Sequence, residues 1–200
     1  MARAALVVVD VQRDFCPGGS LPVSHGDQVV PKLNRVIEAF ERNGNPIFFT
    51  RDWHPPDHCS FEGQGGTWPP HCVMGTRGAE FHPGLRVPAG ATVISKASRR
   101  NVEAYSAFQG TDLARRLKKD RVSDLFLGGL ATDYCVKESS LDALAHGFAV
   151  SVMRDCVKGV NLRRTDSALA LRAVASRGAR LITSTEAIKL CQRAAMKSSS

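Results

Sequence analysis

The chain has 200 residues, of which 43% are hydrophobic, and a formal net charge of +8. That length fits one domain over residues 1–200, and because no apolar run reaches about 18 residues, we expect neither a membrane span nor a signal core. Six cysteines without a CxxC pair argue for reduced thiols and against a disulfide framework, so the expected location is the cytoplasm.

The positive charge raises the question of a nucleic-acid partner. The basic residues are spread along helical segments, however, and only two Trp and two Tyr are available to stack on bases. We therefore expect solvated helix faces, with no nucleic-acid or membrane partner. The sequence leaves the formation of a homo-oligomer open.

Short apolar runs alternate with longer amphipathic segments along the chain. The predicted strands are 5–10, 46–50, 92–96, 124–129, 148–153 and 179–183. The predicted helices are 27–42, 111–119, 133–146, 164–177 and a last one from about Ser184. This alternation predicts a doubly wound, three-layer α/β fold, with a six-stranded, mostly parallel sheet covered by helices on both faces.

Two segments depart from this alternation. Residues 51–91 are rich in Pro, Gly and His and lack a clear period, and loops longer than roughly 12–15 residues in a compact domain are usually functional or disordered. Because this one contains both tryptophans and four of the six histidines, we expect a functional loop. The last residues, 194–200, are predicted to be a disordered tail.

Three residues with complementary chemistry follow predicted strands. Asp10 ends the first strand, Lys96 ends the third, and Cys135 follows the fourth, on strands that we expect to be neighbours. In this architecture ligands bind beyond the carboxyl ends of the strands. Cys135 lies just inside a predicted helix start with Thr132 or Asp133 as its cap, so free N–H groups and the helix dipole would favour a thiolate and could hold an oxyanion.

Each of these residues also has an ordinary interpretation. Most free cysteines are small buried hydrophobes, Asp10 could cap a turn, and Lys96 could be a solvated charge. A thiol nucleophile, however, needs a base to take its proton and a cation to favour the anion. The three residues together therefore predict nucleophilic catalysis by Cys135.

A second group of candidate ligands lies in the long loop. Asp52 and His54 alternate on an extended segment, so both side chains point to one face, and His71 follows. The spacing is not that of a zinc finger, and a surface turn is the alternative. One carboxylate and two imidazoles would leave open positions on a divalent metal and suit zinc, iron or manganese alike.

Several motifs together resemble the nicotinamidases among the isochorismatase-like cysteine hydrolases. They are VVVDVQRDFCPGGSLPV, RDWHPPDH, SKAS, EAYSAFQGTDL and GGLATDYCV, and the match as a whole runs from about Leu6 to Asn161. The resemblance implies a triad of Asp10, Lys96 and Cys135 and one divalent metal, zinc in the first place, on Asp52, His54 and His71.

The same resemblance implies further site residues. The backbone N–H groups of Ala131 and Cys135 would form the oxyanion hole, after a cis peptide between Leu130 and Ala131. Phe15 and Trp68 match aromatic positions that sandwich the substrate ring, and Tyr105 is a further candidate for that wall. For an additional metal ligand Glu62, Ser60 and His58 compete, and we favour Glu62.

The activity that the resemblance implies is hydrolysis of nicotinamide to nicotinate and ammonia through a Cys135 thioester, an amidohydrolase reaction of NAD salvage. Pyrazinamide would be a second substrate. Two alternatives within the superfamily are N-carbamoyl compounds and isochorismate-like ethers. A metal-stabilised binding domain with an inert Cys135, and a metal-hydroxide hydrolase, are the alternatives from other classes.

Overall fold

A single parallel sheet forms the centre of the protein. The computed structural model describes residues 3–198, with side chains as far as Gln192. The six strands are β1 (Arg3–Val9), β2 (Ile47–Asp52), β3 (Thr92–Lys96), β4 (Val122–Leu130), β5 (Ala149–Lys158) and β6 (Arg180–Ile182). Their order is β3-β2-β1-β4-β5-β6, and all five neighbouring pairs are parallel.

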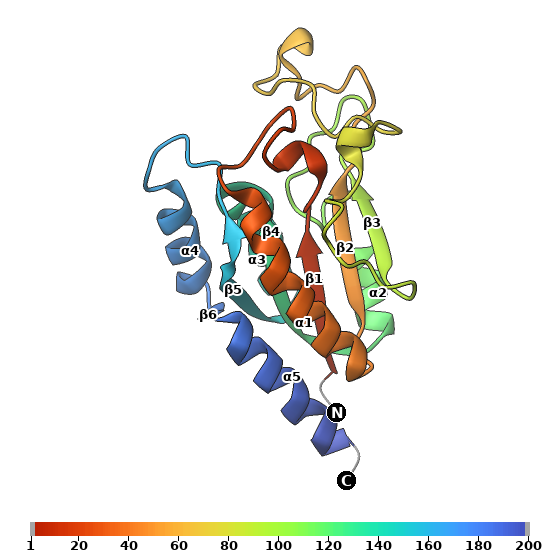
Figure 1. The fold of residues 1–200 in the computed structure, drawn as a ribbon, viewed down its shortest axis with the longest axis vertical. Coiled ribbons are helices and arrows are strands. Elements are labelled where there is room, and N and C mark those ends of the chain that lie inside the picture. Colours follow the sequence, from red (N-terminus) through yellow and green to blue (C-terminus); the bar gives the residue numbers. More distant parts are fainter. Residues whose placement is uncertain (1–2, 199–200) are drawn as a thin grey trace.

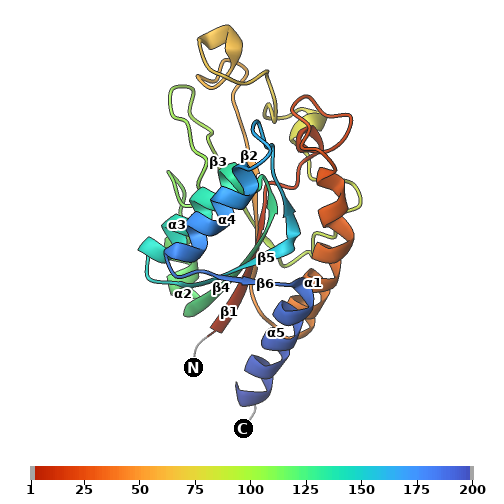
Figure 2. The ribbon, with the colours of Figure 1, turned by 90° about the vertical axis from the view of Figure 1, so that its left-hand side faces the viewer.

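Helices cover both faces of this sheet. They are α1 (Val30–Arg42), α2 (Leu113–Lys119), α3 (Lys137–Ala145), α4 (Asp166–Ser176) and α5 (Ser184–Ser198). Figure 1 shows α1 and α5 in front of the sheet, and in Figure 2 these two helices lie on one side of it while α2, α3 and α4 lie on the other. The predicted three-layer, doubly wound fold is therefore confirmed.

The C-terminal helix extends further than we expected. The chain is helical to Ser198, so the predicted disordered tail of 194–200 overlaps the end of α5. Ser199 and Ser200 lie outside the described residues.

The central strands are apolar on both faces because both faces are covered. In β1, Leu6 and Val8 belong to the core cluster beneath α1 and α5, whereas Val7 and Val9 belong to the cluster beneath α2, α3 and α4. All four side chains are fully buried. This arrangement explains the continuous run of apolar residues that predicted a parallel strand.

Strands β1 and β4 approach closely at their carboxyl ends. Gly129 has a φ of 130°, and a Cβ atom there would lie 2.0 Å from the carbonyl oxygen of Val9. Only glycine fits this position. It brings the end of β1, followed by Asp10, against the end of β4.

The long loop between β2 and β3 is ordered by local contacts. It contains two short 3-10 helices, Glu62–Gln64 and Arg77–Ala79, and isolated bridges pair His54 with Val73 and Phe61 with Trp68. In Figure 1 this loop lies above the carboxyl ends of the strands. It is therefore placed to complete a site at that edge of the sheet.

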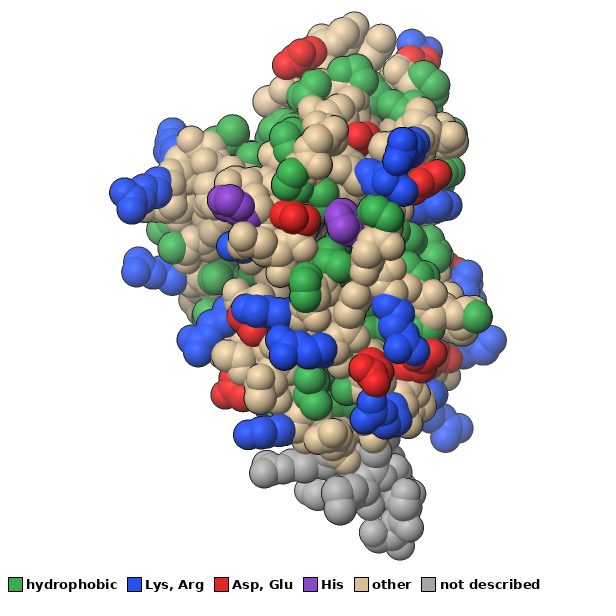
Figure 3. Space-filling model, in the orientation of Figure 1, with side chains coloured by type: hydrophobic (Ala, Val, Ile, Leu, Met, Phe, Trp, Pro, Cys, Tyr) green, Lys and Arg blue, Asp and Glu red, His purple; other side chains and the backbone are tan. Residues whose placement is uncertain are grey.

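The positive charge is distributed over the surface. Figure 3 shows Lys and Arg side chains scattered over one face, with Asp and Glu side chains among them. Several form surface ion pairs, such as Arg86 with Glu41 and Arg116 with Asp112. Within residues 3–198, no helix is long and apolar enough to cross a membrane.

Candidate active site

The site lies where the strand order reverses. The chain runs outward from β1 to β2 and β3, and then returns to β4 on the other side of β1. In open parallel sheets such a switch point forms a crevice at the carboxyl ends of the strands. Asp10 directly follows β1 and Cys135 follows β4, so these two residues meet at the crevice, as predicted from the sequence.

Lys96 reaches the same place by a different route from the one that we expected. Its strand, β3, is an edge strand and not a neighbour of β4. In the register of β2 and β3, Lys96 lies opposite Asp52, and its long side chain extends across β2 towards Asp10. The sequence alone did not show this reach, because it depends on which strand lies between.

The three side chains are in direct contact. The Nζ of Lys96 lies 3.0 Å from Asp10 Oδ2 and 3.4 Å from Cys135 Sγ, and it donates to the carbonyl of Ala104 at 3.1 Å. The hydroxyl of Thr50 donates to the other Asp10 oxygen at 2.5 Å. The predicted catalytic residues therefore form one buried cluster.

Burial and charge set the protonation of this cluster. Burial raises the pKa of the Cys135 thiol well above its ordinary value, with Lys96 acting against this and Asp10 adding to it. Burial also raises the pKa of Asp10, against the effect of Lys96. Burial would lower the pKa of the Lys96 ammonium, but Asp10 and Asp52 beside it raise that pKa well above its usual range. Burial thus favours the thiol form of Cys135, and the two neighbouring carboxyl groups favour the charged form of Lys96.

The backbone conformation around Cys135 corrects one expectation from the sequence. Cys135 does not lie in the first turn of a capped α-helix but in a π-helical turn, Thr132–Val136, whose N-cap is Ala131 and which has no side-chain cap. Asp133 instead accepts hydrogen bonds from the N–H groups of Val160 at 2.9 Å and Asn161 at 2.7 Å. Burial raises the pKa of Cys135 and so opposes the thiolate that the helix start was expected to favour; the carboxyl group of Asp10 lies beside the sulfur as a candidate base.

The segment before Cys135 has the backbone that the resemblance implied. The peptide between Leu130 and Ala131 is cis. The carbonyl of Ala131 accepts the N–H groups of Tyr134 at 3.2 Å and Val136 at 3.0 Å, which closes the turn. Among the described residues no acceptor binds the N–H of Ala131, so this donor is free for a developing oxyanion.

The predicted metal ligands are brought together beside this cluster. One ligand atom from each of Asp52, His54 and His71 lies within 4.8 Å of the others, and all three residues are buried. Burial would raise the pKa of Asp52, but Lys96 and His54 hold it well below its usual range. Asp52 is therefore an anionic ligand candidate.

The hydrogen bonding of the two histidines fits a metal site. Both ring nitrogens of His54 are buried, and neither has a hydrogen-bond partner among the described residues. The Nδ1–H of His71 donates to the carbonyl of Pro69 at 2.8 Å, which leaves its Nε2 lone pair free. Metal-bound imidazoles usually make such a backbone contact through the second nitrogen. One carboxylate and two imidazoles suit zinc, iron or manganese.

The additional ligand that we favoured is not in this group. Glu62 is exposed at the start of a 3-10 helix on the loop surface. His58 is engaged through both nitrogens, with the Ser60 hydroxyl at 2.7 Å and the Val102 carbonyl at 3.1 Å. Neither Glu62 nor His58 belongs to the buried ligand cluster, and the hydroxyl of Ser60 is paired with His58.

Gln12, which was not predicted from the sequence, holds a metal-ligand candidate in place. Its side-chain carbonyl accepts the N–H of Asp52 at 2.8 Å, and its amide group donates to the Asp52 carbonyl at 2.8 Å and to that of Ala79 at 3.0 Å. Gln12 is fully buried. It fixes the Asp52 backbone against the end of β1, and only its position two residues after Asp10 could have drawn attention to it.

Aromatic side chains line the site. Phe15 packs against His71 with ring centroids 5.6 Å apart, and the indole N–H of Trp68 donates to the Tyr105 hydroxyl at 3.0 Å. The three predicted wall residues are therefore near the ligand cluster or paired with each other. Tyr134, which we did not predict, contacts both Trp68 and Tyr105, with centroids 5.2 and 5.4 Å away.

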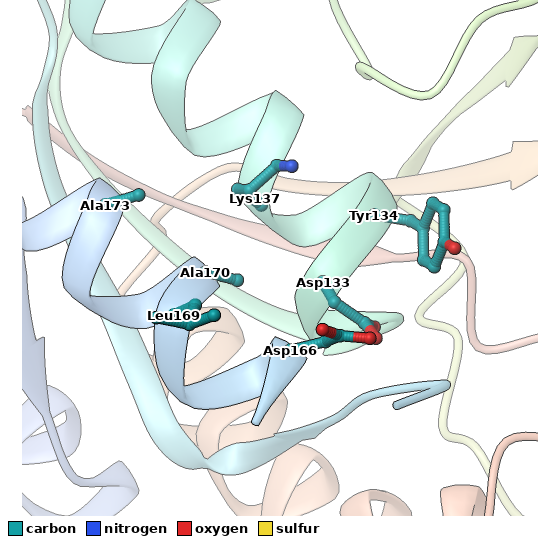
Figure 4. A pocket seen from close by; sticks show the side chains of 7 residues that line it. All are labelled: Asp133, Tyr134, Lys137, Asp166, Leu169, Ala170 and Ala173. Atoms are coloured by element: carbon teal, nitrogen blue, oxygen red, sulfur yellow. The ribbon is translucent and has the colours of Figure 1, made fainter. Parts of the chain in front are cut away.

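Tyr134 also borders a cavity of about 380 Å³ between α3 and α4. Figure 4 shows that Asp133 and Asp166 line it, with the Tyr134 ring directed away from them. Leu169 and Ala170 of α4 form its apolar side. Tyr134 therefore lies between this cavity and the aromatic group of Trp68 and Tyr105.

Known proteins are similar to this chain in sequence and in fold. The isochorismatase domain family matches residues 4–186. A nicotinamidase of Escherichia coli is 40% identical over 204 residues, which cover 92% of this chain and 96% of the relative. A nicotinamidase/pyrazinamidase of Mycobacterium tuberculosis is 38% identical over 173 residues, covering 82% and 91% of the two chains.

A solved structure agrees with these relatives. The pyrazinamidase of Pyrococcus horikoshii in complex with zinc is 49% identical, with a TM-score of 0.87 over 90% of this chain and 99% of that one. The resemblance that the sequence motifs indicated is thereby confirmed, and the chain belongs to the isochorismatase family.

Proposed function

We propose that the protein is a nicotinamidase that hydrolyses nicotinamide to nicotinate and ammonia, and that it also accepts pyrazinamide. One observation carries the proposal: the buried Lys96 contacts Asp10 and Cys135 on one side and the ligand candidate Asp52 on the other. A nucleophile and a metal-binding group therefore share one site. The names of the relatives supply the substrate class.

Acylation begins with proton transfer, because burial of Cys135 favours its thiol form. Asp10 takes the proton of Cys135, and the sulfur attacks the carboxamide carbon. The negative charge on the carbonyl oxygen is accepted by the N–H groups of Ala131 and Cys135. Asp10 returns the proton to the leaving nitrogen, and ammonia departs.

Deacylation uses the same groups. Asp10 takes a proton from water, which attacks the thioester carbonyl, and the acid leaves as the thiol is restored. Lys96 stabilises the negative charge that moves between Asp10 and Cys135, and its bonds to Asp52 and the Ala104 carbonyl hold it in position.

Asp52, His54 and His71 would hold one divalent metal ion, with zinc as the first candidate because of the zinc-bound relative. Bound there, the ion supplies Lewis acidity towards the pyridine nitrogen. The side chains of Phe15, Trp68 and Tyr105 orient the ring. This combination favours a pyridine amide over the N-carbamoyl and isochorismate-like substrates considered from the sequence.

Nicotinate release would serve pyridine nucleotide salvage. That role, a cytoplasmic location and the absence of a nucleic-acid partner remain predictions from the sequence. A homo-oligomer likewise remains open.

The test is to trap the intermediate. Mass spectrometry after rapid acid quenching of the protein with nicotinamide is expected to find a nicotinoyl group on Cys135. Cys135→Ala should lose on the order of 10³-fold or more of the activity while the protein stays folded and binds zinc. Cys156→Ala, at another buried thiol, should retain activity and adduct. An adduct elsewhere, or full activity in Cys135→Ala, would contradict the mechanism.

A further inference from the structure

Asp14 joins three separate segments beside the site, although the mechanism does not use it. Its Oδ2 accepts the N–H of Cys72 at 2.8 Å, and its Oδ1 accepts the N–H of Ser20 at 3.2 Å. A Cβ atom on Gly78 would lie 2.2 Å from Oδ2, so the backbone there packs directly on the carboxylate. Asp14 thus ties the chain after β1 to the long loop, 58 residues further on.

Asp14 holds Cys72, whose backbone is connected to both histidines of the metal-ligand cluster. Cys72 directly follows His71, and its carbonyl accepts the N–H of His54 at 3.0 Å. Its φ of 46° is in the left-handed region, which a cysteine adopts only where surrounding contacts enforce it. The bond to Asp14 is one such contact. A single residue, Cys72, therefore connects Asp14 to both histidines.

Asp14 is also next in sequence to Phe15, one of the aromatic residues predicted to contact the substrate ring. Phe15 follows Asp14 directly, and its ring packs against that of His71 with centroids 5.6 Å apart. The N–H of Val23 donates to the Phe15 carbonyl at 3.1 Å, and that of Leu21 to the Asp14 carbonyl at 3.0 Å, which closes the segment around the carboxylate. The distance between the aromatic wall and the metal ligand is therefore set across Asp14.

We propose that Asp14 is a positioning residue that sets the spacing between the ring wall at Phe15 and the metal ligands His71 and His54. The inference rests on the proposed function for its substrate and deepens the description of the same site. Asp14 makes no hydrogen bond to the described side chains of Asp10, Lys96 or Cys135. Its loss should therefore disturb metal and ring binding more than the chemical step.

Two variants test this role from opposite sides of the contact. Asp14→Asn keeps the shape but faces two N–H donors with only one acceptor oxygen. Gly78→Ala leaves Asp14 intact but forces its carboxylate to move. The matched control is Asp155→Asn, because Asp155, in β5, also accepts a backbone N–H, that of Ser184 at the start of α5. The Asp155→Asn protein should be destabilised about as much as the Asp14→Asn protein, but its substitution lies away from the site.

Zinc affinity is measured on the purified metal-free proteins by competition with a chromogenic chelator, together with their melting temperatures. Asp14→Asn and Gly78→Ala should each bind zinc at least about 10-fold more weakly than the wild type, whereas Asp155→Asn should not. In steady-state assays of the two site variants, KM for nicotinamide should also rise about 10-fold, whereas kcat should change by less than about threefold.

The inference is overturned if zinc affinity in both site variants stays at the level of Asp155→Asn, or if kcat falls while KM is unchanged. Should Asp14→Asn not fold, Gly78→Ala decides. Zinc binding needs no turnover, so it tests Asp14 even if the wild type fails to hydrolyse nicotinamide. That failure would contradict the proposed function alone.

Discussion

At the scale of single residues, Lys96 connects the two carboxyl groups of the site to the thiol. Its fully buried ammonium is shared by two carboxylates, Asp10 and Asp52, and lies 3.4 Å from the sulfur of Cys135. By formal charge, one Lys and two Asp side chains give this group an excess of one negative charge. An isolated buried charge is costly, so a cation on the Asp52 side would balance it.

Removing this ammonium should be far more costly than removing one at the surface. Lys96→Met leaves two buried carboxylates facing each other, and we expect a loss of about 3–5 kcal/mol in the free energy of unfolding, together with loss of activity. Lys32→Met is the control, because Lys32 is partly exposed and pairs with Asp155 at 3.5 Å. It should change stability by no more than about 1 kcal/mol.

Urea denaturation monitored by circular dichroism measures both variants. A Lys96→Met protein as stable as Lys32→Met would show that the buried ion pairs do not hold the carboxyl ends of the strands together.

At the scale of elements, the apolar runs predicted the strands and helices well. Every predicted strand and helix is present, because in a doubly wound fold a strand is buried on both faces and a helix on one. The π turn at Cys135 was not foreseen, since its sequence is also compatible with an ordinary helix start. The reach of Lys96 was also unforeseen, because the sequence shows which strands exist but not which strand lies between them.

The start of α5 provides a test of element stability. Asp155, in β5, accepts the N–H of Ser184 at 2.7 Å and its hydroxyl at 2.8 Å. Burial would raise the pKa of Asp155, but these hydrogen bonds and Lys32 lower it below its ordinary value. A carboxyl group with a lowered pKa stabilises the fold above its unfolded pKa and loses that effect as the pH falls through its folded pKa.

Asp155→Asn should therefore lower the free energy of unfolding by about 1 kcal/mol at neutral pH. The difference from the wild type should shrink as the pH falls from about 5 towards 3, when the wild-type carboxyl becomes protonated. Urea denaturation at a series of pH values measures it. A difference that stayed constant over this range would show that the charge of Asp155 does not contribute to holding α5.

At the scale of the whole molecule, the site combines residues of two kinds. Asp10, Cys135 and Asp52 stand at or just beyond the ends of apolar strands, so their sequence positions already placed them at one edge of the sheet. Gln12 and Asp14 act through hydrogen bonds to residues 40 and 58 positions away. No local pattern encodes such contacts, because they depend on how the long loop folds back over β1.

The distribution of charge also becomes clear only at this scale. On the face that Figure 3 shows, acidic side chains lie among basic ones, and the chain as a whole has a net charge of +8, whereas the buried group of Asp10, Asp52 and Lys96 contains more acidic than basic side chains. The composition alone therefore described the surface and not the site. A substrate amide without charge meets no electrostatic barrier in such a site, and a divalent cation is favoured there.

The most direct test of the account is ammonia release from nicotinamide and from benzamide, which lacks the ring nitrogen, before and after removal of the metal by a chelator. We expect rapid release from nicotinamide, much slower release from benzamide, and loss of the nicotinamide activity on chelation with recovery when zinc is added back. Failure to hydrolyse nicotinamide under any metal loading, or equal release from both amides, would contradict the account.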